Sequence, residues 1–158
     1  MSNSGAVPFE TTHLIRDACL CLHVQRAARA LSRLFDEALR PVGLTSGQFS
    51  LLNALNRPEP PSIAPVAQLL AMDRTTLTAA LKPLERDGLV AIAKDPDDRR
   101  NRLLHLTDKG REVLAAAIPI WRSLHGAIEA GVAEFEPDHL RGALKDLSKS
   151  APARTVTA

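Results

Sequence analysis

Two long segments, one near each end of the chain, carry apolar residues at intervals of three and four positions, the spacing of one face of an α-helix. In residues 12–40 this stripe consists of Leu14, Ala18, Cys21, Leu22, Ala28, Leu31, Phe35 and Ala38. Further apolar residues widen the stripe, so we expect this helix to be buried on more than one side. Pro41 and Gly43 predict its end.

The second long helix is predicted to begin after Thr107, whose hydroxyl is suited to cap the first turn. Its apolar stripe consists of Leu114, Ala117, Ile118, Trp121, Leu124, Ile128 and Val132. Pro119 removes a backbone donor from this helix and should kink it. A last helix is expected from Pro137, with one apolar face made of Leu140, Ala143, Leu144 and Leu147.

Shorter elements are predicted between the two long helices. Thr45 and Gln48 have the spacing of a capping box, which predicts a helix that continues to Leu55. A proline-rich loop follows, and Ser62 is expected to cap a second, short helix.

A third short helix over residues 74–87 is predicted from Asp73 at its start and Gly88 at its end. Two segments that alternate apolar and polar residues follow it, and an acidic, Arg-rich turn separates them. Strand side chains alternate between the two faces of a sheet, so the pattern predicts a β-hairpin. The side chains expected to share one face are Val90, Ile92, Leu104 and Leu106.

These elements predict a mainly α-helical fold with a small β-hairpin wing, a winged helix-turn-helix with N- and C-terminal dimerisation helices. We expect flexible tails at residues 1–9 and 150–158, helical dimerisation segments at 10–40 and 111–149, and a winged helix-turn-helix DNA-binding region at 41–110. A central region of this size cannot cover both long stripes, which favours a two-fold homodimer. The alternative is that both stripes form the core of a monomer.

Composition narrows the class of protein only slightly. The chain has 158 residues and is 45% hydrophobic, but it contains four Phe, one Trp and no Tyr, so its core must be mainly aliphatic. A net charge of +2 does not by itself indicate nucleic acid, because local patches of charge decide phosphate binding. No apolar run approaches the roughly 20 residues of a membrane span, and the N-terminus has no signal-peptide pattern. With Cys19 and Cys21 as free thiols, we expect a cytoplasmic protein.

The motifs of several large enzyme classes are missing from the sequence. We find no phosphate-binding glycine loop, nucleophile elbow or metalloprotease motif, and the His and Cys residues do not have zinc-finger spacing. We therefore expect no enzymatic activity, no cofactor and no metal. A thiol peroxidase that uses Cys21 is the one enzymatic alternative.

The helix over residues 74–87 has the side chains needed to read DNA in a major groove, where short polar residues flanked by cations reach bases and phosphates. The candidate DNA-binding residues on this helix are Arg74, Thr75, Thr76, Thr78 and Lys82. Thr76 lies where its hydroxyl and the N-terminal amides could hold a phosphate. The alternative is that these threonines only cap the helix, but the Arg-rich hairpin that follows favours DNA reading.

The turn of the hairpin supplies further candidate DNA-binding residues, which are Asp98, Arg99, Arg100 and Arg102. Its acidic residues nearly cancel the charge of the arginines, and we expect one Asp to hold an Arg side chain in a fixed direction. A guanidinium held in this way can enter a narrow minor groove, where the potential is most negative. The alternative is a charged turn that faces only water.

At these residues the chain resembles the MarR family of bacterial winged-helix regulators. The wing pattern of that family is Asp-x-x-Asp-x-Arg, then an apolar strand, then Leu-Thr-x-x-Gly. The segments that carry the resemblance are Asp95–Arg100, Leu104–Gly110, Thr76–Glu85 and Gly43–Phe49. The resemblance covers residues 12–148, and the combination of motifs is far more specific than any one of them.

The resemblance implies a homodimer that binds double-stranded DNA at an inverted repeat, usually represses transcription, and is released by a small-molecule or oxidative signal. It also implies that Arg100 enters the minor groove and that Asp98 orients it. Pro83 departs from the expected recognition helix, because it removes a hydrogen bond there. A winged-helix adaptor that binds proteins and not DNA is the alternative.

Two sets of residues are candidates for receiving the signal. Cys21 lies where the OhrR-like, hydroperoxide-sensing branch of the family carries its reactive thiol, although that branch also uses tyrosines, which this chain lacks. On one continuous helix Cys19 and Cys21 would point about 200° apart, so no bond between them is expected. An inert, buried Cys is the alternative.

The second set could bind a small-molecule effector. The resemblance places the usual pocket where the dimerisation helices meet the winged region. The candidate residues for an anionic ligand there, such as an aromatic carboxylate, are His13, Arg16, His23 and Arg26.

Overall fold

A computed structural model describes residues 6–98, 100–132, 134 and 136–149 of the chain. Its elements in chain order are α1 (Phe9–Ala18), α2 (Leu20–Leu39), the 3-10 helix η1 (Arg40–Val42), α3 (Ser46–Leu55), α4 (Ile63–Leu69), α5 (Arg74–Arg86), β1 (Val90–Lys94), β2 (Arg102–Leu106), α6 (Asp108–Gly131) and α7 (Pro137–Lys149). The predicted class, mainly α with a two-stranded antiparallel hairpin, is confirmed. None of the described helices is long and apolar enough to cross a membrane.

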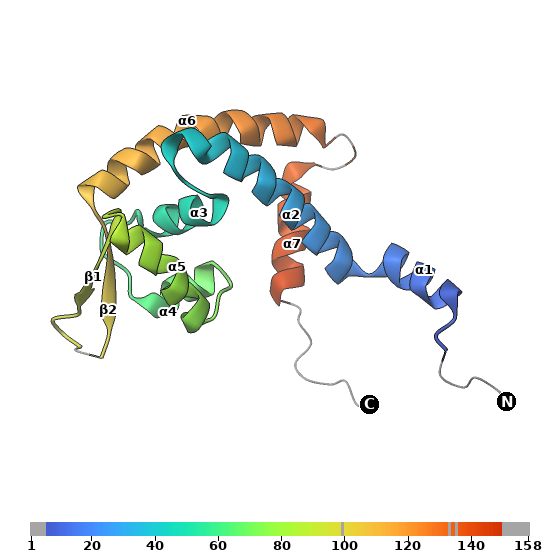
Figure 1. Cartoon of the computed structure of the whole chain (residues 1–158), viewed down its shortest axis with the longest axis horizontal. Helices are drawn as coiled ribbons and strands as arrows, with labels where there is room; N and C mark the ends of the chain where they lie inside the picture. The colour runs from blue at the N-terminus through green and yellow to red at the C-terminus, as the bar shows by residue number, and fades with distance from the viewer. Residues whose placement is uncertain (1–5, 99, 133, 135, 150–158) are drawn as a thin grey trace.

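The hydrophobic core lies in the winged region, where α3, α4 and α5 pack against the hairpin, η1 and the first half of α6 (Figure 1). Its fully buried side chains are Leu39, Leu51, Leu52, Val66, Leu77, Leu81, Leu84, Val90 and Leu104. Each such side chain contributes roughly 1.5–3 kcal/mol relative to an exposed position. The aliphatic core expected from the composition is therefore confirmed.

The hairpin has the register that the alternation predicts. Val90 pairs with Leu106 and Ile92 pairs with Leu104, so these four side chains share the face that packs on the core. The backbone N–H of Leu104 also donates to the Pro61 carbonyl at 2.9 Å. This bond fixes the wing against the chain that leads into α4.

Most of the predicted helix starts are confirmed. Thr45 forms a complete capping box with Gln48, and Asp73 and Thr107 accept backbone hydrogen bonds at the starts of α5 and α6. Ser62 does occupy the cap position of α4, but its side chain makes no capping hydrogen bond, so that part of the prediction is wrong.

The prediction of one continuous helix over residues 12–40 is wrong. Cys19 has an extended backbone (φ −74°, ψ 104°) that separates α1 from α2. The ring of His23 contacts the Asp17 carbonyl, with 3.1 Å between Nε2 and the oxygen, and so satisfies one acceptor near the break. No residue of α1 is buried, so no tertiary packing keeps α1 in line with α2. The 200° angle expected between Cys19 and Cys21 does not apply to this broken helix.

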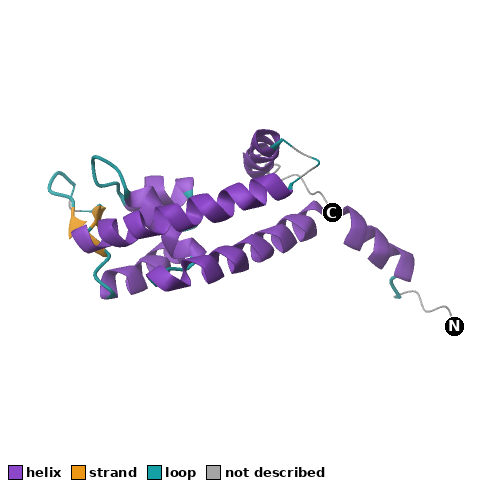
Figure 2. Ribbon diagram, turned by 90° about the horizontal axis from the view of Figure 1, so that it is seen from above, coloured by secondary structure: helices purple, strands orange, loops and turns teal. Residues whose placement is uncertain are grey.

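The long helices α2 and α6 run side by side, and α7 runs across the far end of the pair (Figure 2). Their apolar stripes are not covered within one chain: Leu39 is the only buried residue of α2, and α7 has none. The large apolar side chains exposed on α1, α2 and α7 are Phe9, Leu14, Ile15, Leu20, Val24, Leu31, Leu34, Leu140, Leu144 and Leu147.

Gly110 provides a test of how α6 is joined to the hairpin. A Cβ at this position would overlap the Leu89 carbonyl oxygen and would lie 2.8 Å from Leu106 Cδ1. We therefore expect Gly110→Ala to lower the free energy of unfolding by about 1–3 kcal/mol, the usual cost of overpacking, as measured by urea denaturation.

The matched control lies on the same helix. A methyl group added at Gly126 would have no atom within 4 Å, so Gly126→Ala should raise the free energy of unfolding, by about 0.5–1 kcal/mol through helix propensity. Equal effects of the two substitutions would contradict the close approach at Gly110.

Candidate nucleic-acid interface

Helix α5 has one buried face and one exposed polar face. Leu77, Leu81 and Leu84 are at most 1% exposed, and they fix the rotation of the helix about its own axis. The predicted outer residues Arg74, Thr75, Thr76, Thr78 and Lys82 are all exposed. Helix α5 continues through Pro83 to Arg86, so the proline does not end it.

The threonines at the start of α5 differ in what their hydroxyls do. Asp73 accepts the backbone N–H of Thr76 through Oδ1 and the Thr76 hydroxyl through Oδ2, both at 2.7 Å. The Thr78 hydroxyl donates to the Arg74 carbonyl, also at 2.7 Å. In the free protein both hydroxyls therefore donate hydrogen bonds to groups of the same helix start. This is the result expected if these threonines only cap the helix. Among the described residues, the Thr75 hydroxyl has no such partner.

Asp73 also sets the electrostatics of this helix start. Hydrogen bonds from the backbone and hydroxyl of Thr76 hold the pKa of Asp73 below its ordinary value. The carboxylate therefore stays ionised beside the first-turn amides and occupies the place where Thr76 was expected to hold a phosphate.

The acidic residues of the wing organise its backbone. Asp95 Oδ1 accepts the backbone N–H of Asp97 at 2.9 Å, and Asp98 Oδ1 accepts that of Arg100 at 3.0 Å. Asp98 Oδ2 also accepts from the side chain of Asn101 at 3.3 Å. The expectation that an Asp holds an Arg side chain is not met within the described part of the wing, because these carboxylates are taken up by the turn. Asp98 thus fixes the position of Arg100 through the main chain.

This arrangement leaves the guanidinium groups of Arg100 and Arg102 available to bind other molecules. Arg100 and Arg102 are exposed, and neither guanidinium has an acidic partner among residues 6–98, 100–132, 134 and 136–149. Arg99 lies outside the described residues. The hairpin register places Lys94 directly opposite Arg102. Lys94 was not among the DNA-binding candidates named from the sequence, although the predicted pairing of the two strands already indicated that it lies near Arg102.

Comparison with known proteins identifies the family. A model of the MarR family matches residues 42–101, which include α5 and most of the wing. The transcriptional repressor NicR of Pseudomonas putida is 31% identical over 112 residues, which span 68% of this chain and 71% of NicR. The DNA complex of the M. tuberculosis transcriptional regulator MosR is 36% identical with a TM-score of 0.77, over 84% of this chain and 96% of that one. The chain belongs to the MarR family.

The relatives in the MarR family differ in the fraction of their length that this chain matches. The transcriptional activatory protein BadR of Rhodopseudomonas palustris is 34% identical over 113 residues, which cover 69% of this chain. The match spans 65% of BadR, less than two thirds of its length. The comparisons establish the fold and the family.

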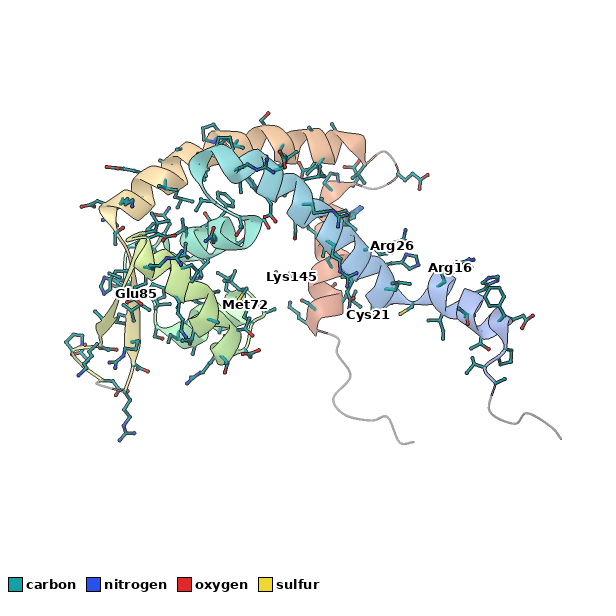
Figure 3. All side chains as sticks on the ribbon, viewed as in Figure 1. Arg16, Cys21, Arg26, Met72, Glu85 and Lys145 are labelled. Carbon is teal, nitrogen blue, oxygen red and sulfur yellow. The ribbon has the colours of Figure 1, made fainter. Side chains whose placement is uncertain are left out.

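The candidate signal residues lie far from α5 and the wing. Figure 3 shows Arg16, Cys21 and Arg26 on α1 and the first turns of α2, on the opposite side of the molecule from Glu85 on α5. Cys19 is half-buried and Cys21 is exposed, and neither forms a disulfide. Gln25 Nε2 donates to Cys21 Sγ at 3.2 Å. The described residues contain no group of His, Cys, Asp and Glu that could hold a metal ion.

Asp17 changes the expected anion site, and sequence reasoning missed it. Its carboxylate forms a bidentate ion pair with Arg16 at 2.6 and 2.8 Å, which lowers the pKa of Asp17 and raises that of Arg16. His13 lies against Phe9, with ring centroids 4.4 Å apart. Arg16 therefore has an exposed counterion of its own in this structure.

A cavity of about 310 Å³ does occur where α2 meets the winged region. It is lined by Leu31, Ser32, Phe35, Ser46, Gly47, Ser50, Leu70 and Met72. None of the four predicted effector residues, His13, Arg16, His23 and Arg26, is among them.

The cap of α5 makes a prediction about acid stability. Because the folded-state pKa of Asp73 is lowered, its stabilising effect is present above the ordinary value of 3.8 and is lost as the pH falls through the lower folded-state value. Asn caps helices nearly as well but does not titrate. We expect the difference in free energy of unfolding between the wild type and Asp73→Asn to shrink as the pH falls below about 4. Urea denaturation at a series of pH values measures it, and a constant difference would contradict it.

Proposed function

We propose that this MarR-family chain is a sequence-specific DNA-binding transcriptional regulator that acts as a homodimer on an inverted repeat. One observation carries the proposal: the exposed polar face of α5 stands beside a wing whose described guanidinium groups have no acidic partner. Cationic side chains with no partner in the protein can neutralise phosphates and release the counterions bound there. This release of counterions is the main source of DNA affinity. Family membership supports the same function.

We propose a different contact with DNA for α5 and for the wing. Thr75 and Thr78 on α5 are proposed to face base edges in the major groove, while Arg74 and Lys82 contact phosphates on either side. Arg100 is proposed to enter the minor groove, with Asp98 fixing its main chain. Thr76, Arg99 and Arg102 complete the proposed contacts, and Lys94 joins them from the opposite strand.

The uncovered apolar faces support the dimer. Leu14 and Leu20 are each 65% exposed and Leu34 is 50% exposed, far more apolar surface on helices than a stable monomer usually leaves in water. We propose that residues 10–40 and 111–149 pair with those of a second copy. Residues 41–110 of each copy then face successive major grooves, about 34 Å apart.

The direction of regulation and the cellular location are also proposals. NicR is named a repressor and BadR an activatory protein, so both outcomes occur among relatives. We propose repression in the cytoplasm with release by a small molecule or an oxidant. A reporter whose expression falls when the protein is removed would contradict repression.

The main test combines selection of DNA with one substitution. Selection from random duplexes should return an inverted repeat, as a homodimer requires. On that operator, Arg100→Ala should lower affinity by about tenfold to a hundredfold and reduce the dependence of log affinity on log salt by about one. Fluorescence anisotropy at several salt concentrations measures both.

Arg122→Ala is the matched control. This arginine is exposed on α6 about 20 Å along the helix from its start at the wing, so its loss should leave affinity unchanged. Selection of an asymmetric site, or no selected site at all, would refute the dimer or the DNA-binding function. A protein-binding adaptor would show no steep salt dependence.

A second candidate function is redox sensing of the OhrR-like kind through Cys21. The observation that favours it is an exposed thiol that accepts a hydrogen bond from Gln25, because such a bond stabilises a thiolate. In this reaction the sulfur attacks a peroxide oxygen, the O–O bond breaks, and a sulfenic acid and an alcohol or water result.

Peroxide should then weaken operator binding by the wild type and by Cys19→Ser but leave Cys21→Ser unaffected. The measurement is anisotropy before and after treatment with one equivalent of an organic hydroperoxide. Identical responses of the wild type and Cys21→Ser would remove this candidate. Sustained turnover of peroxide with a reductant would instead indicate a thiol peroxidase.

A further inference from the structure

Ala79 lies in the middle of the exposed face of α5. It is two residues from Leu77 and two from Leu81, and two residues turn a helix by about 200°. Because both leucines are buried, the Ala79 methyl group points away from the core. Its neighbours on the helix surface, Thr75 one turn before it and Lys82 one turn after it, are exposed as well. The methyl group therefore lies on the face that a recognition helix turns towards base edges.

The segment of α5 between its two flanking cations lacks the side chains that read bases through paired hydrogen bonds. Between Arg74 and Lys82 the sequence is Thr-Thr-Leu-Thr-Ala-Ala-Leu, with no Asn, Gln, Arg or Lys. Asn and Gln are the usual bidentate partners of adenine, and Arg and Lys are those of guanine. Along this segment, side-chain contacts with base edges must therefore come from threonine hydroxyls or from methyl groups.

Two of the three hydroxyls in this segment already bind groups of the helix start. The Thr76 hydroxyl donates to Asp73, and the Thr78 hydroxyl donates to the Arg74 carbonyl, both at 2.7 Å. With the Thr78 hydroxyl held in this way, the methyl group is the remaining heavy atom of that side chain beyond Cβ. Methyl groups are therefore a larger part of the exposed face of α5 than its threonine content suggests.

Thymine is the base that offers a matching apolar group. In the major groove it presents a C5-methyl group beside its O4 acceptor, whereas adenine, guanine and unmodified cytosine present no methyl group there. Contact between two methyl groups removes apolar surface of both from water. An exposed alanine on a recognition helix therefore favours thymine over a base that has the same hydrogen-bonding groups but no methyl.

We propose that Ala79 is a specificity-determining residue, which selects thymine at one position of each half-site through contact between the two methyl groups. This assignment rests on the proposed function, because it names the base that the same surface reads. Arg74 and Lys82 place the helix on the phosphates and contribute no preference among bases. The preference for thymine then comes from the apolar residue between them.

The test replaces thymine by deoxyuridine, which keeps the hydrogen-bonding groups and lacks the C5-methyl, in the operator that selection returns. Each thymine position of the half-site is replaced in turn, and fluorescence anisotropy at constant salt measures the affinity of the full chain. At one position or more, replacement in one half-site should lower affinity about fourfold, and replacement in both about sixteenfold, as expected for one buried methyl group in each. At the same position, a pair of guanine with 5-methylcytosine should bind about fourfold more tightly than one with cytosine.

Ala79→Gly assigns the response to this residue, because it removes only the methyl group of the protein. The variant should bind the thymine and deoxyuridine duplexes equally well at one responding position. Ala116→Gly is the matched control, since Ala116 is an exposed alanine of α6, and it should keep the preference of the wild type. Circular dichroism confirms that both variants are folded.

Two results would overturn the role of Ala79 while leaving the proposed function intact. One is a selected operator in which no thymine position responds to deoxyuridine or 5-methylcytosine, a result that needs only the wild-type protein. The other is an Ala79→Gly variant that keeps the full preference for thymine, as it would if Ala79 only allowed α5 to approach the groove closely. If selection returns no operator, the proposed function fails and the role of Ala79 fails with it.

Discussion

The contact between the start of α6 and the end of α5 joins the two halves of this protein. Thr107 accepts the backbone N–H of Gly110 at 3.0 Å, which caps α6, and its hydroxyl donates to the Gly88 carbonyl at 2.8 Å. The Thr107 backbone N–H also donates to the Leu89 carbonyl at 3.1 Å. Because Gly110 has no side chain, α6 can approach the backbone of Leu89, the residue before β1. A movement of α6 must therefore move the wing and α5 with it.

This connection gives a physical route for regulation. The apolar faces of α1, α2 and α7 lie at one end of the molecule, and the polar face of α5 and the wing lie at the other (Figure 1). In the proposed dimer, whatever sets the spacing of the two copies through the long helices also sets the distance between their α5 helices.

The wing shows how a nearly neutral segment can still present free cations. The carboxylates of Asp95 and Asp98 accept hydrogen bonds from backbone amides of the turn, so their charge is fixed close to the main chain, while Arg100 and Arg102 are exposed. The acidic residues therefore order the turn, and the arginines are the groups that we propose to contact phosphates. A larger net charge would add nonspecific affinity without this order.

Sequence alone was sufficient for several features whose decisive contacts are local, although the cap expected from the Ser62 side chain does not form. The caps at Thr45, Asp73 and Thr107 follow from spacing of three residues, and the hairpin register follows from alternation between two short strands. The inward face of α5 follows from leucines at helical intervals. Residues close together along the chain constrain one another before any tertiary packing, so their pattern carries the information.

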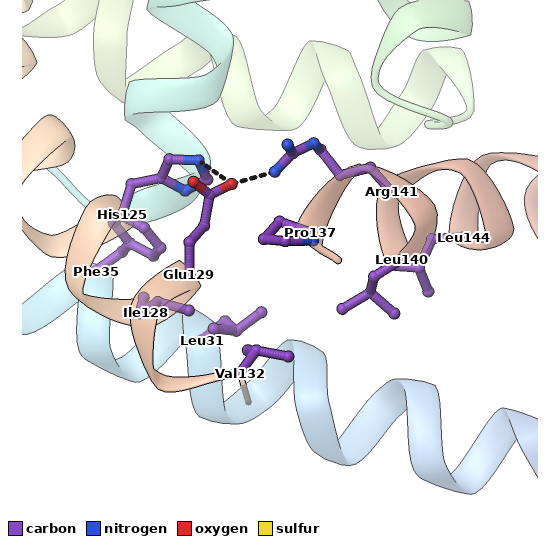
Figure 4. Close-up of a pocket in the computed structure, with 10 residues that line it drawn as sticks. All are labelled: Leu31, Phe35, His125, Ile128, Glu129, Val132, Pro137, Leu140, Arg141 and Leu144. Carbon is purple, nitrogen blue, oxygen red and sulfur yellow. Dashed lines mark hydrogen bonds and ion pairs between the residues drawn. The ribbon is translucent and has the colours of Figure 1, made fainter. Parts of the chain in front are cut away.

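The tertiary structure decided what depends on distant or competing partners. It broke the first long helix at Cys19, gave Arg16 to Asp17, and used Asp98 for the backbone of Arg100 and not for its guanidinium. It also brought Glu129 and Arg141 together across two helices, α6 and α7 (Figure 4). The Glu129–Arg141 pair joins two helices, and only the positions of these helices bring its partners within reach. The other outcomes lie within two residues along the chain, where several local polar partners compete and the sequence pattern does not say which one is used.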